Sequence, residues 1–205
     1  MTKIVQFQRY PRDEKVMRMC PPIRKIQGKS ALEVLTEFGN PNEVPINLET
    51  VLKNIGISAL PMDFTDLESK LNKKNILGLV LSDDKNAVIY YSAADTPHRQ
   101  QFTIAHELGH ICTHLRVDTT DYPYIDWRID GEDYSPTEKI ANIFAGELLI
   151  PLHKLKEEYL ALGSFRSKDL AKRFGVSVNV MEKRLDHLKI SYYNEEGQAV
   201  THGYE

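Results

Sequence analysis

Apolar residues recur at helical spacing near the start of this 205-residue chain, and residues that start or stop helices bound each run. Ser30 precedes an apolar run over residues 31–38, which Gly39 closes. A second short helix is expected over residues 47–55. It ends at Gly56, the residue type that most often follows a helix. The pattern therefore predicts two short helices before the middle of the chain.

The middle of the chain changes from helical spacing to short runs rich in β-branched and aromatic residues. Residues 76–81 and 87–91 are two such runs on either side of a polar turn, and they predict a β-hairpin. Thr96 and Pro97 then supply an N-cap and a proline at the first helical position. We expect a helix from there to about residue 115.

Beyond that helix, the pattern predicts a polar loop over residues 117–134 and then more helices. Ser135 and Pro136 open the next helix in the same way as Thr96 and Pro97 do, and it ends before Pro151. The stretch up to residue 188 is helical in pattern, with breaks at two glycines, Gly163 and Gly175. Helices, a small antiparallel sheet and more helices predict an α+β fold.

Composition restricts the class of protein. With 41% hydrophobic and 27% charged residues, the chain is typical of a globular protein. No apolar run approaches the ~20 residues that cross a bilayer, and the polar, basic N-terminus does not resemble a secretory signal, so no membrane partner is expected. The two cysteines, Cys20 and Cys112, cannot form a disulfide framework. These features predict a cytoplasmic protein.

Charge is unevenly distributed along the chain. Residues 1–30 carry a net charge of +6 and residues 31–149 a net charge of −10. The basic, proline-containing residues 1–28 are interpreted as an N-terminal arm, which could dock over the acidic centre and restrain it. Residues 29–151 are then the expected core, and residues 152–205 a C-terminal helical segment and tail. The acidic centre suits a metal or a cationic substrate, although solvated surface charge is the commoner cause.

The helix expected from Pro97 carries the pattern His106-Glu107-Leu108-Gly109-His110. Histidines four positions apart lie one turn apart on one helical face, so both imidazoles can reach a single ion. Glu107 is rotated by about 100° from His106, which places its carboxylate beside such an ion as a base rather than a ligand. Zn²⁺ suits these donors, with one position left for water. The pattern predicts a catalytic zinc site.

Such a pattern also arises by chance in ordinary helices, so its surroundings matter. Here it lies on a segment with an independent helix start and an apolar stripe on the other side. The stripe consists of Phe102, Ala105, Leu108, Ile111 and Leu115. Gly109 inside the helix costs about 1 kcal/mol relative to alanine, which indicates that close packing is needed there.

A catalytic zinc ion normally takes three protein ligands, so a third is expected downstream. His114 lies eight residues after His106 and would approach the ion only with strain. The acidic candidates are Asp118, Asp121, Asp126, Asp130, Glu132, Asp133, Glu138 and Glu147. Cys20 is a further alternative, since a thiolate binds zinc well, but a buried or solvated cysteine without such a role is the commoner case.

Helical geometry favours Glu138 among the acidic candidates. Glu138 shares a helical face with Asn142 and Ala145, and the small residues Ala141 and Ala145 would let this helix approach the histidine helix closely. Glu147 is nine positions further on, about 180° away around the helix.

A second interpretation of Glu138 is local. Ser135-Pro136-Thr137-Glu138 is also a capping-box pattern, in which the Glu138 carboxylate would bond back to the Ser135 N–H. One carboxylate cannot serve both the backbone and an ion as its main role. The residues alone leave the two interpretations open.

The two motifs together resemble the ImmA/IrrE family of metallopeptidases. The stretch from Arg99 to His110 is followed by a Glu-x-x-x-Asn-x-x-Ala-x-x-Leu-Leu-x-Pro block from Glu138 to Pro151. The resemblance implies a zincin-like metallopeptidase core over roughly residues 30–190. It implies zinc ligands at His106, His110 and Glu138, and Glu107 as the catalytic base. Asn142 would orient the site.

The C-terminal helical segment has the pattern of a helix-turn-helix. Gly175 falls at the turn and Ser177 caps the second helix, on which Asn179, Lys183 and Arg184 are the candidate DNA contacts. A helical pair that packs on the core or binds a protein is the favoured interpretation, because the local charge is weak for a DNA reader. DNA binding stays possible.

The resemblance implies a cytoplasmic zinc metallo-endopeptidase that cleaves a protein. Its expected substrate is a helix-turn-helix repressor encoded nearby, whose cleavage would derepress a stress, mobile-element or defence operon. Two alternatives remain: a zincin scaffold that binds a repressor or DNA without cleavage, and the proteolytic toxin of a toxin–antitoxin pair. An intact Glu107 argues against the scaffold, because a structural zinc site needs no carboxylate there.

Overall fold

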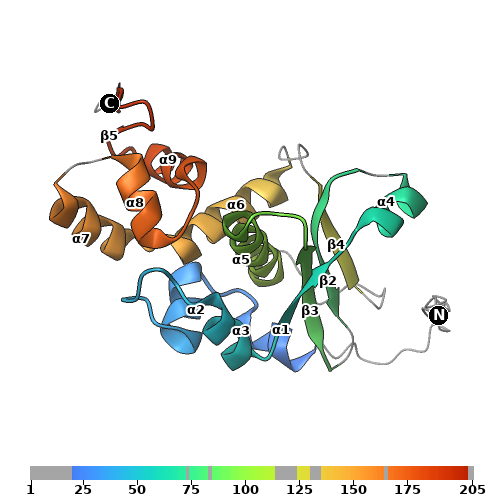
Figure 1. Cartoon of the computed structure of the whole chain (residues 1–205). Coiled ribbons are helices and arrows are strands. Elements are labelled where there is room, and N and C mark those ends of the chain that lie inside the picture. The colour runs from blue at the N-terminus through green and yellow to red at the C-terminus, as the bar shows by residue number, and fades with distance from the viewer. Residues whose placement is uncertain are drawn as a thin grey trace, which may run out of the picture.

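A small sheet in the middle of the chain packs against helices that precede and follow it (Figure 1). In this computed structural model the described residues are 20–72, 74–82, 85–113, 124–129 (backbone only), 135–163 and 166–202. Their elements, in chain order, are α1 (Pro21–Ile26), α2 (Ala31–Phe38), α3 (Leu48–Ile55), β1 (Ser58–Met62), α4 (Thr65–Leu71), β2 (Ile76–Ser82), β3 (Ala87–Ser92), α5 (Pro97–Thr113), β4 (Tyr124–Ile129), α6 (Pro136–Leu149), α7 (Leu152–Leu162), α8 (Ser167–Phe174), α9 (Val178–His187), β5 (Tyr192–Tyr193) and β6 (Ala199–Val200). The α+β class predicted from the sequence is confirmed.

The predicted helices begin and end at their capping residues. Ser30 Oγ accepts a hydrogen bond from the Glu33 N–H at the start of α2, and Asn47 Oδ1 accepts one from the Thr50 N–H at the start of α3. Helix α3 ends at Gly56, whose φ of 94° lies in the left-handed region that glycine adopts without strain. Among the described helices, none is both long and apolar enough to cross a membrane.

The larger sheet has the strand order β1-β3-β2-β4 and is mixed. Strands β2 and β3 form the predicted antiparallel hairpin, with Val80 opposite Ile89. Strand β1, which the sequence pattern did not predict, pairs parallel to β3. The sheet is therefore not wholly antiparallel as expected: the chain reverses direction twice, into β2 and again into β3, so β1 and β3 run the same way.

Strand β4 lies inside the stretch predicted to be a polar loop, and that prediction is wrong for residues 124–129. The strand pairs antiparallel with β2, from Tyr124 opposite Ser82 to Ile129 opposite Ile76. Asp and Tyr residues on both sides of the strand mask its apolar members in the sequence pattern. Pairing with a neighbouring strand decides its conformation more than local propensity does.

Helices α5 and α6 pack closely because small residues face each other where they meet. A Cβ atom added to Gly109 on α5 would lie 3.0 Å from the Ala141 carbonyl oxygen and 3.2 Å from the Phe144 Cβ on α6. No side chain fits at position 109 without displacing α6, which explains the glycine in the middle of a helix. This close contact sets the distance between the functional groups of the two helices.

One hydrophobic cluster extends from α1 through α5 and α6 to the C-terminal helices. It includes Cys20, Ile23 and Ile26, which lie on one side of α1 and are buried. The arm interpretation is therefore wrong for residues 20–28, because their apolar spacing places this short helix in the core. Residues 1–19 lie outside the described part of the chain.

Helices α8 and α9 form the helical pair that the sequence predicts. Gly175, with a φ of 66°, makes the turn between them, and Ser177 Oγ accepts a hydrogen bond from the Val180 N–H at 3.2 Å. A Cβ atom on Gly175 would lie 3.0 Å from the Cβ of Pro45, so this turn packs against the loop before α3. Figure 1 shows the pair on the side of α5 and α6 away from the sheet.

Candidate metal centre

His106 and His110 lie one turn apart on α5, as the spacing predicts, and their rings meet edge to face. Their Nε2 atoms are 2.9 Å apart. His106 is fully buried, and His110 is 4% exposed. Two imidazole lone pairs at this distance repel each other unless a proton or a cation lies between them. The pair is therefore arranged to share a positively charged ligand.

Glu138, in the first turn of α6, faces the two histidines. Its Oε2 lies 3.1 Å from His106 Nε2, and its Oε1 lies 3.0 Å from His110 Nε2. Both carboxylate oxygens thus point at the same two nitrogens. The close packing of α6 on α5 at Gly109 brings this turn within reach.

The capping interpretation of Glu138 is satisfied only by its backbone. Ser135 Oγ accepts a hydrogen bond from the Glu138 N–H at 3.1 Å, which caps α6. The carboxylate, which would complete a capping box by turning back to Ser135, lies against the histidines instead. The serine and the glutamate therefore have separate functions here.

The electrostatics keep Glu138 ionised. Burial raises the pKa of its carboxyl group, but the hydrogen bonds and charges of His106 and His110 lower that pKa more, and the net pKa lies well below its ordinary value. The cluster therefore presents a carboxylate with its negative charge at neutral pH.

Asn142, one turn after Glu138 on α6, fixes the orientation of the first histidine. Its Oδ1 lies 2.9 Å from His106 Nδ1. An amide oxygen only accepts hydrogen bonds, so His106 Nδ1 carries a proton, and Nε2 is the ring nitrogen that faces Glu138 and His110. Partners of this kind set the tautomer and ring orientation of metal-binding histidines.

The three side chains fit a metal ion. Their ligand atoms all lie within 4.8 Å of one another. Donors about 2.1 Å from a tetrahedral ion lie roughly 3.4 Å apart, close to the separations of 2.9, 3.0 and 3.1 Å found here. Two imidazoles and one carboxylate, with one imidazole held by an amide, are a donor set that divalent transition metals prefer. His106, His110 and Glu138 could therefore hold a metal ion.

Glu107 is fully buried next to the first histidine, on the side of α5 that meets the sheet. A Cβ atom on Gly78 of β2 would lie 2.9 Å from Glu107 Oε1 and 2.5 Å from Thr103 Cγ2. The missing side chain at position 78 thus leaves the space in which this carboxylate lies. The register of β2 against β4 also shifts between Ile76 and Gly78.

Gly78 was not singled out from the sequence, although a signal was present. An isolated glycine inside a β-rich run indicates a bulge or a close approach of another group. Both are found here. Gly78 is therefore part of the site, because any larger residue would displace Glu107.

Of the other sequence candidates, those whose side chains the structure describes lie elsewhere. Glu147 pairs with Arg184 at 3.6 Å, on the side of α6 away from the histidines. Cys20 and Cys112 are buried in the hydrophobic cluster, and burial raises the pKa of the Cys112 thiol to about 12. Outside the described residues or side chains lie His114, Asp118, Asp121, Asp126, Asp130, Glu132 and Asp133.

Comparisons with known proteins agree with this geometry. The family model of the peptidase M78 group, described as the IrrE N-terminal-like domain, matches residues 62–186, more than half of the 205-residue chain. Among curated proteins, none matches the chain. The matched range contains both helices that carry the three donors, as well as Glu107 and Gly78. The chain therefore belongs to the IrrE N-terminal-like family of peptidases.

Proposed function

We propose that this protein is a zinc metallo-endopeptidase. The observation that carries the proposal is the convergence of His106, His110 and Glu138 from two helices, with the buried Glu107 next to His106 on the histidine helix. Zinc is the metal that best suits two imidazoles and one carboxylate with a position left open. When bound, it would supply a Lewis acid for a peptide carbonyl and for water.

In this proposal Glu107, Gly78 and Asn142 have separate roles in the reaction. Glu107 accepts a proton from the attacking water and later donates it to the leaving amine, as a general base and then a general acid. Gly78 leaves room for that carboxylate. Asn142 holds the His106 proton on Nδ1, so that Nε2 remains free to bind the metal.

We propose a helix-turn-helix repressor encoded nearby as the substrate, and the cytoplasm as the location. Family membership supports a protein substrate. The ImmA/IrrE resemblance supports a repressor whose cleavage releases a stress, mobile-element or defence operon. Two buried cysteines that form no disulfide in the described part of the chain suit a reducing compartment.

The decisive experiment compares the wild type with Glu107→Gln. Each protein is loaded with zinc and added to a cell extract of the organism that encodes the protein. New protein N-termini are then identified by mass spectrometry. The general base contributes at least ~100-fold to the rate, so the variant should lose the cleavage products while keeping its zinc and its fold. Glu49→Gln, an exposed change on α3, is the matched control and should cleave like the wild type.

The outcomes separate the proposal from its alternatives. Cleavage by Glu107→Gln at near the wild-type rate contradicts the assigned base. Binding of the repressor without cleavage, by both proteins, favours a non-proteolytic scaffold. Cleavage of essential host proteins rather than a repressor favours the toxin of a toxin–antitoxin pair.

A further inference from the structure

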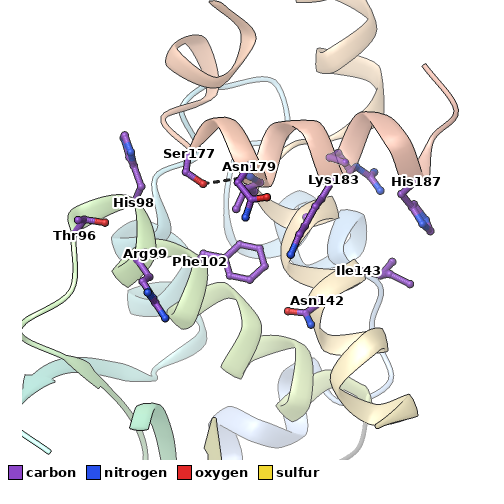
Figure 2. A pocket seen from close by; sticks show the side chains of 13 residues that line it. Thr96, His98, Arg99, Phe102, Asn142, Ile143, Ser177, Asn179, Lys183 and His187 are labelled. Atoms are coloured by element: carbon purple, nitrogen blue, oxygen red, sulfur yellow. Dashed lines mark hydrogen bonds between the residues drawn. The ribbon is translucent and has the colours of Figure 1, made fainter. Parts of the chain in front are cut away.

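A pocket lies next to the metal centre, between α9 on one side and α5 and α6 on the other (Figure 2). It has a volume of about 590 Å³, within the range of roughly 300–1,000 Å³ that small-molecule sites occupy. The pocket is lined by Thr96, His98, Arg99, Phe102, Asn142, Ile143, Gly146, Ser177, Asn179, Val180, Lys183, Arg184 and His187.

The lining is one-sided in charge. Arg99, Lys183 and Arg184 carry permanent positive charges, and His98 and His187 add two imidazoles. Arg99 also pairs with Asp95, which does not line the pocket, at 3.5 Å. Among the described residues that line the pocket, none is acidic, although the chain as a whole has a net charge of −3. Cationic side chains on facing walls raise the local concentration of anions. The pocket is therefore suited to a negatively charged ligand.

Arg184 is the strongest indication that the pocket takes an anion. The residue is only 5% exposed, and its stem passes Gly146, with Cδ 3.6 Å from where a Cβ would stand. Glu147 balances its charge at 3.6 Å. Within the described part of the chain, however, its Nε and Nη1 atoms have no hydrogen-bond partner. Buried donors left unsatisfied cost free energy, and an anion in the pocket would remove that cost.

The remaining walls suit a ligand with a flat apolar part as well as a charge. Figure 2 shows the Phe102 ring between Arg99 and the α9 residues Asn179 and Lys183, and Asn142 beside it on α6. An aromatic face supports stacking of a planar ring. The amides of Asn142 and Asn179 can donate and accept hydrogen bonds.

We propose that this pocket binds a small phosphorylated molecule of about the size of a mononucleotide. Its phosphate lies on Lys183 and Arg184, which bind a multiply charged group better than a single carboxylate, and its planar part lies on Phe102. The α9 side chains that a recognition helix would offer to DNA face α5 and α6 across this pocket. A compact ligand therefore fits there better than a duplex.

Binding of the ligand would also affect the metal centre through Asn142. Asn142 lines the pocket and bonds to His106 Nδ1 at 2.9 Å. A ligand that forms a hydrogen bond with the Asn142 amide would change the hydrogen bond that orients His106. Binding itself does not depend on peptidase activity, so it can be tested separately.

The test is isothermal titration calorimetry of the full chain with inorganic phosphate, AMP, ADP and a tri-glutamate peptide as probes. We expect saturable binding of the nucleotides with one site per chain. Lys183→Glu on α9 should weaken it by at least ~10-fold, since it removes a charge-assisted contact to the phosphate, and Arg99→Gln on α5 should weaken it less, since it only lowers the positive charge of the wall that faces the phosphate. Lys172→Glu, an exposed change on α8 outside the pocket, is the matched control and should bind like the wild type.

Both changed residues are exposed, so the variants should fold, and equal melting temperatures will verify this. Nucleotide binding that falls in the two pocket variants and not in the control supports the proposal. Three results overturn it: no saturable binding of any phosphorylated probe, binding that Lys183→Glu leaves unchanged, or tighter binding of tri-glutamate than of the nucleotides. The last result would assign the pocket to an acidic protein segment.

Discussion

Two helices of this protein begin with the same pattern and use its last residue differently. Helix α2 starts at Ser30 and has Glu33 three residues later; helix α6 starts at Ser135 and has Glu138 in the same place. In both, the serine Oγ accepts the N–H of the glutamate. At α2 the carboxylate also turns back, 2.7 Å from the Ser30 nitrogen, and completes a capping box. At α6 it turns to two histidines.

The difference teaches that the neighbouring helix, and not the local sequence, decides where the carboxylate goes. Glu33 is exposed, and its own helix end is the best donor within reach. Glu138 is half-buried against α5, where two imidazoles offer stronger partners. The backbone cap is kept in both cases, because it needs only the serine. A capping box and a metal ligand can therefore share one sequence pattern.

The largest expected effect is on zinc affinity, which should depend on Glu138 and not on Glu33. Glu138→Ala should weaken zinc affinity by more than ~100-fold, because even partners outside the ligand set cost 10–100-fold when they are removed. Glu33→Ala should leave the affinity unchanged. Competition titration against a zinc chelator measures both. Equal affinities in the two variants would reduce Glu138 to a cap.

A smaller loss is expected from the amide that holds the first histidine. Asn142→Ala should weaken zinc binding by about 10–100-fold, because His106 loses the acceptor that fixes its tautomer. Asn142→Asp keeps an oxygen acceptor at that position and should recover most of the affinity. Equal losses in both variants would mean that the amide acts through packing rather than through the hydrogen bond.

The serine N-cap is the feature that the two helices share, and removing it tests the comparison in another way. Ser30→Ala and Ser135→Ala should each lower the free energy of unfolding by about 1 kcal/mol, the usual cost of a lost N-cap. Urea denaturation of the metal-free protein measures this. Ser135→Ala should keep zinc affinity close to that of the wild type. A large loss of zinc with this variant would show that capping and metal binding are coupled.

The smallest effect is a pH dependence at α2. The hydrogen bonds from Ser30 hold the pKa of Glu33 below its ordinary value of 4.5. A lowered pKa in the folded state stabilises the protein above pH 4.5, and this contribution is lost as the pH falls through the folded value. Glu33→Gln should therefore reduce the loss of stability between about pH 5 and pH 3. Denaturation curves across this range, with Glu49→Gln as the control, measure the change.

Local signals predicted the elements whose ends are marked in the sequence. Thr96 and Pro97 gave the start of α5, and Gly109 indicated the close contact that the structure shows with Ala141. The same spacing brought His106 and His110 together as expected.

Elements that depend on distant partners were not predictable in this way. Strand β4 exists through its pairing with β2, and helix α1 through the core that buries Ile23 and Ile26. The space at Gly78 that receives Glu107 needs the α5–sheet contact to be known. Each of these depends on tertiary neighbours, which composition and periodicity do not report.

The N-terminal helices share one hydrophobic cluster with the rest of the molecule, and this limits where the protein can be shortened. The family match begins at residue 62, whereas the hydrophobic cluster includes α1, α2 and α3 as well. Helix α2 packs on α6, and the turn at Gly175 rests on Pro45. A chain trimmed to the homologous range would leave the apolar side of the Glu138 helix open to water and prone to aggregate. The unit that folds is therefore larger than the range that the family model matches.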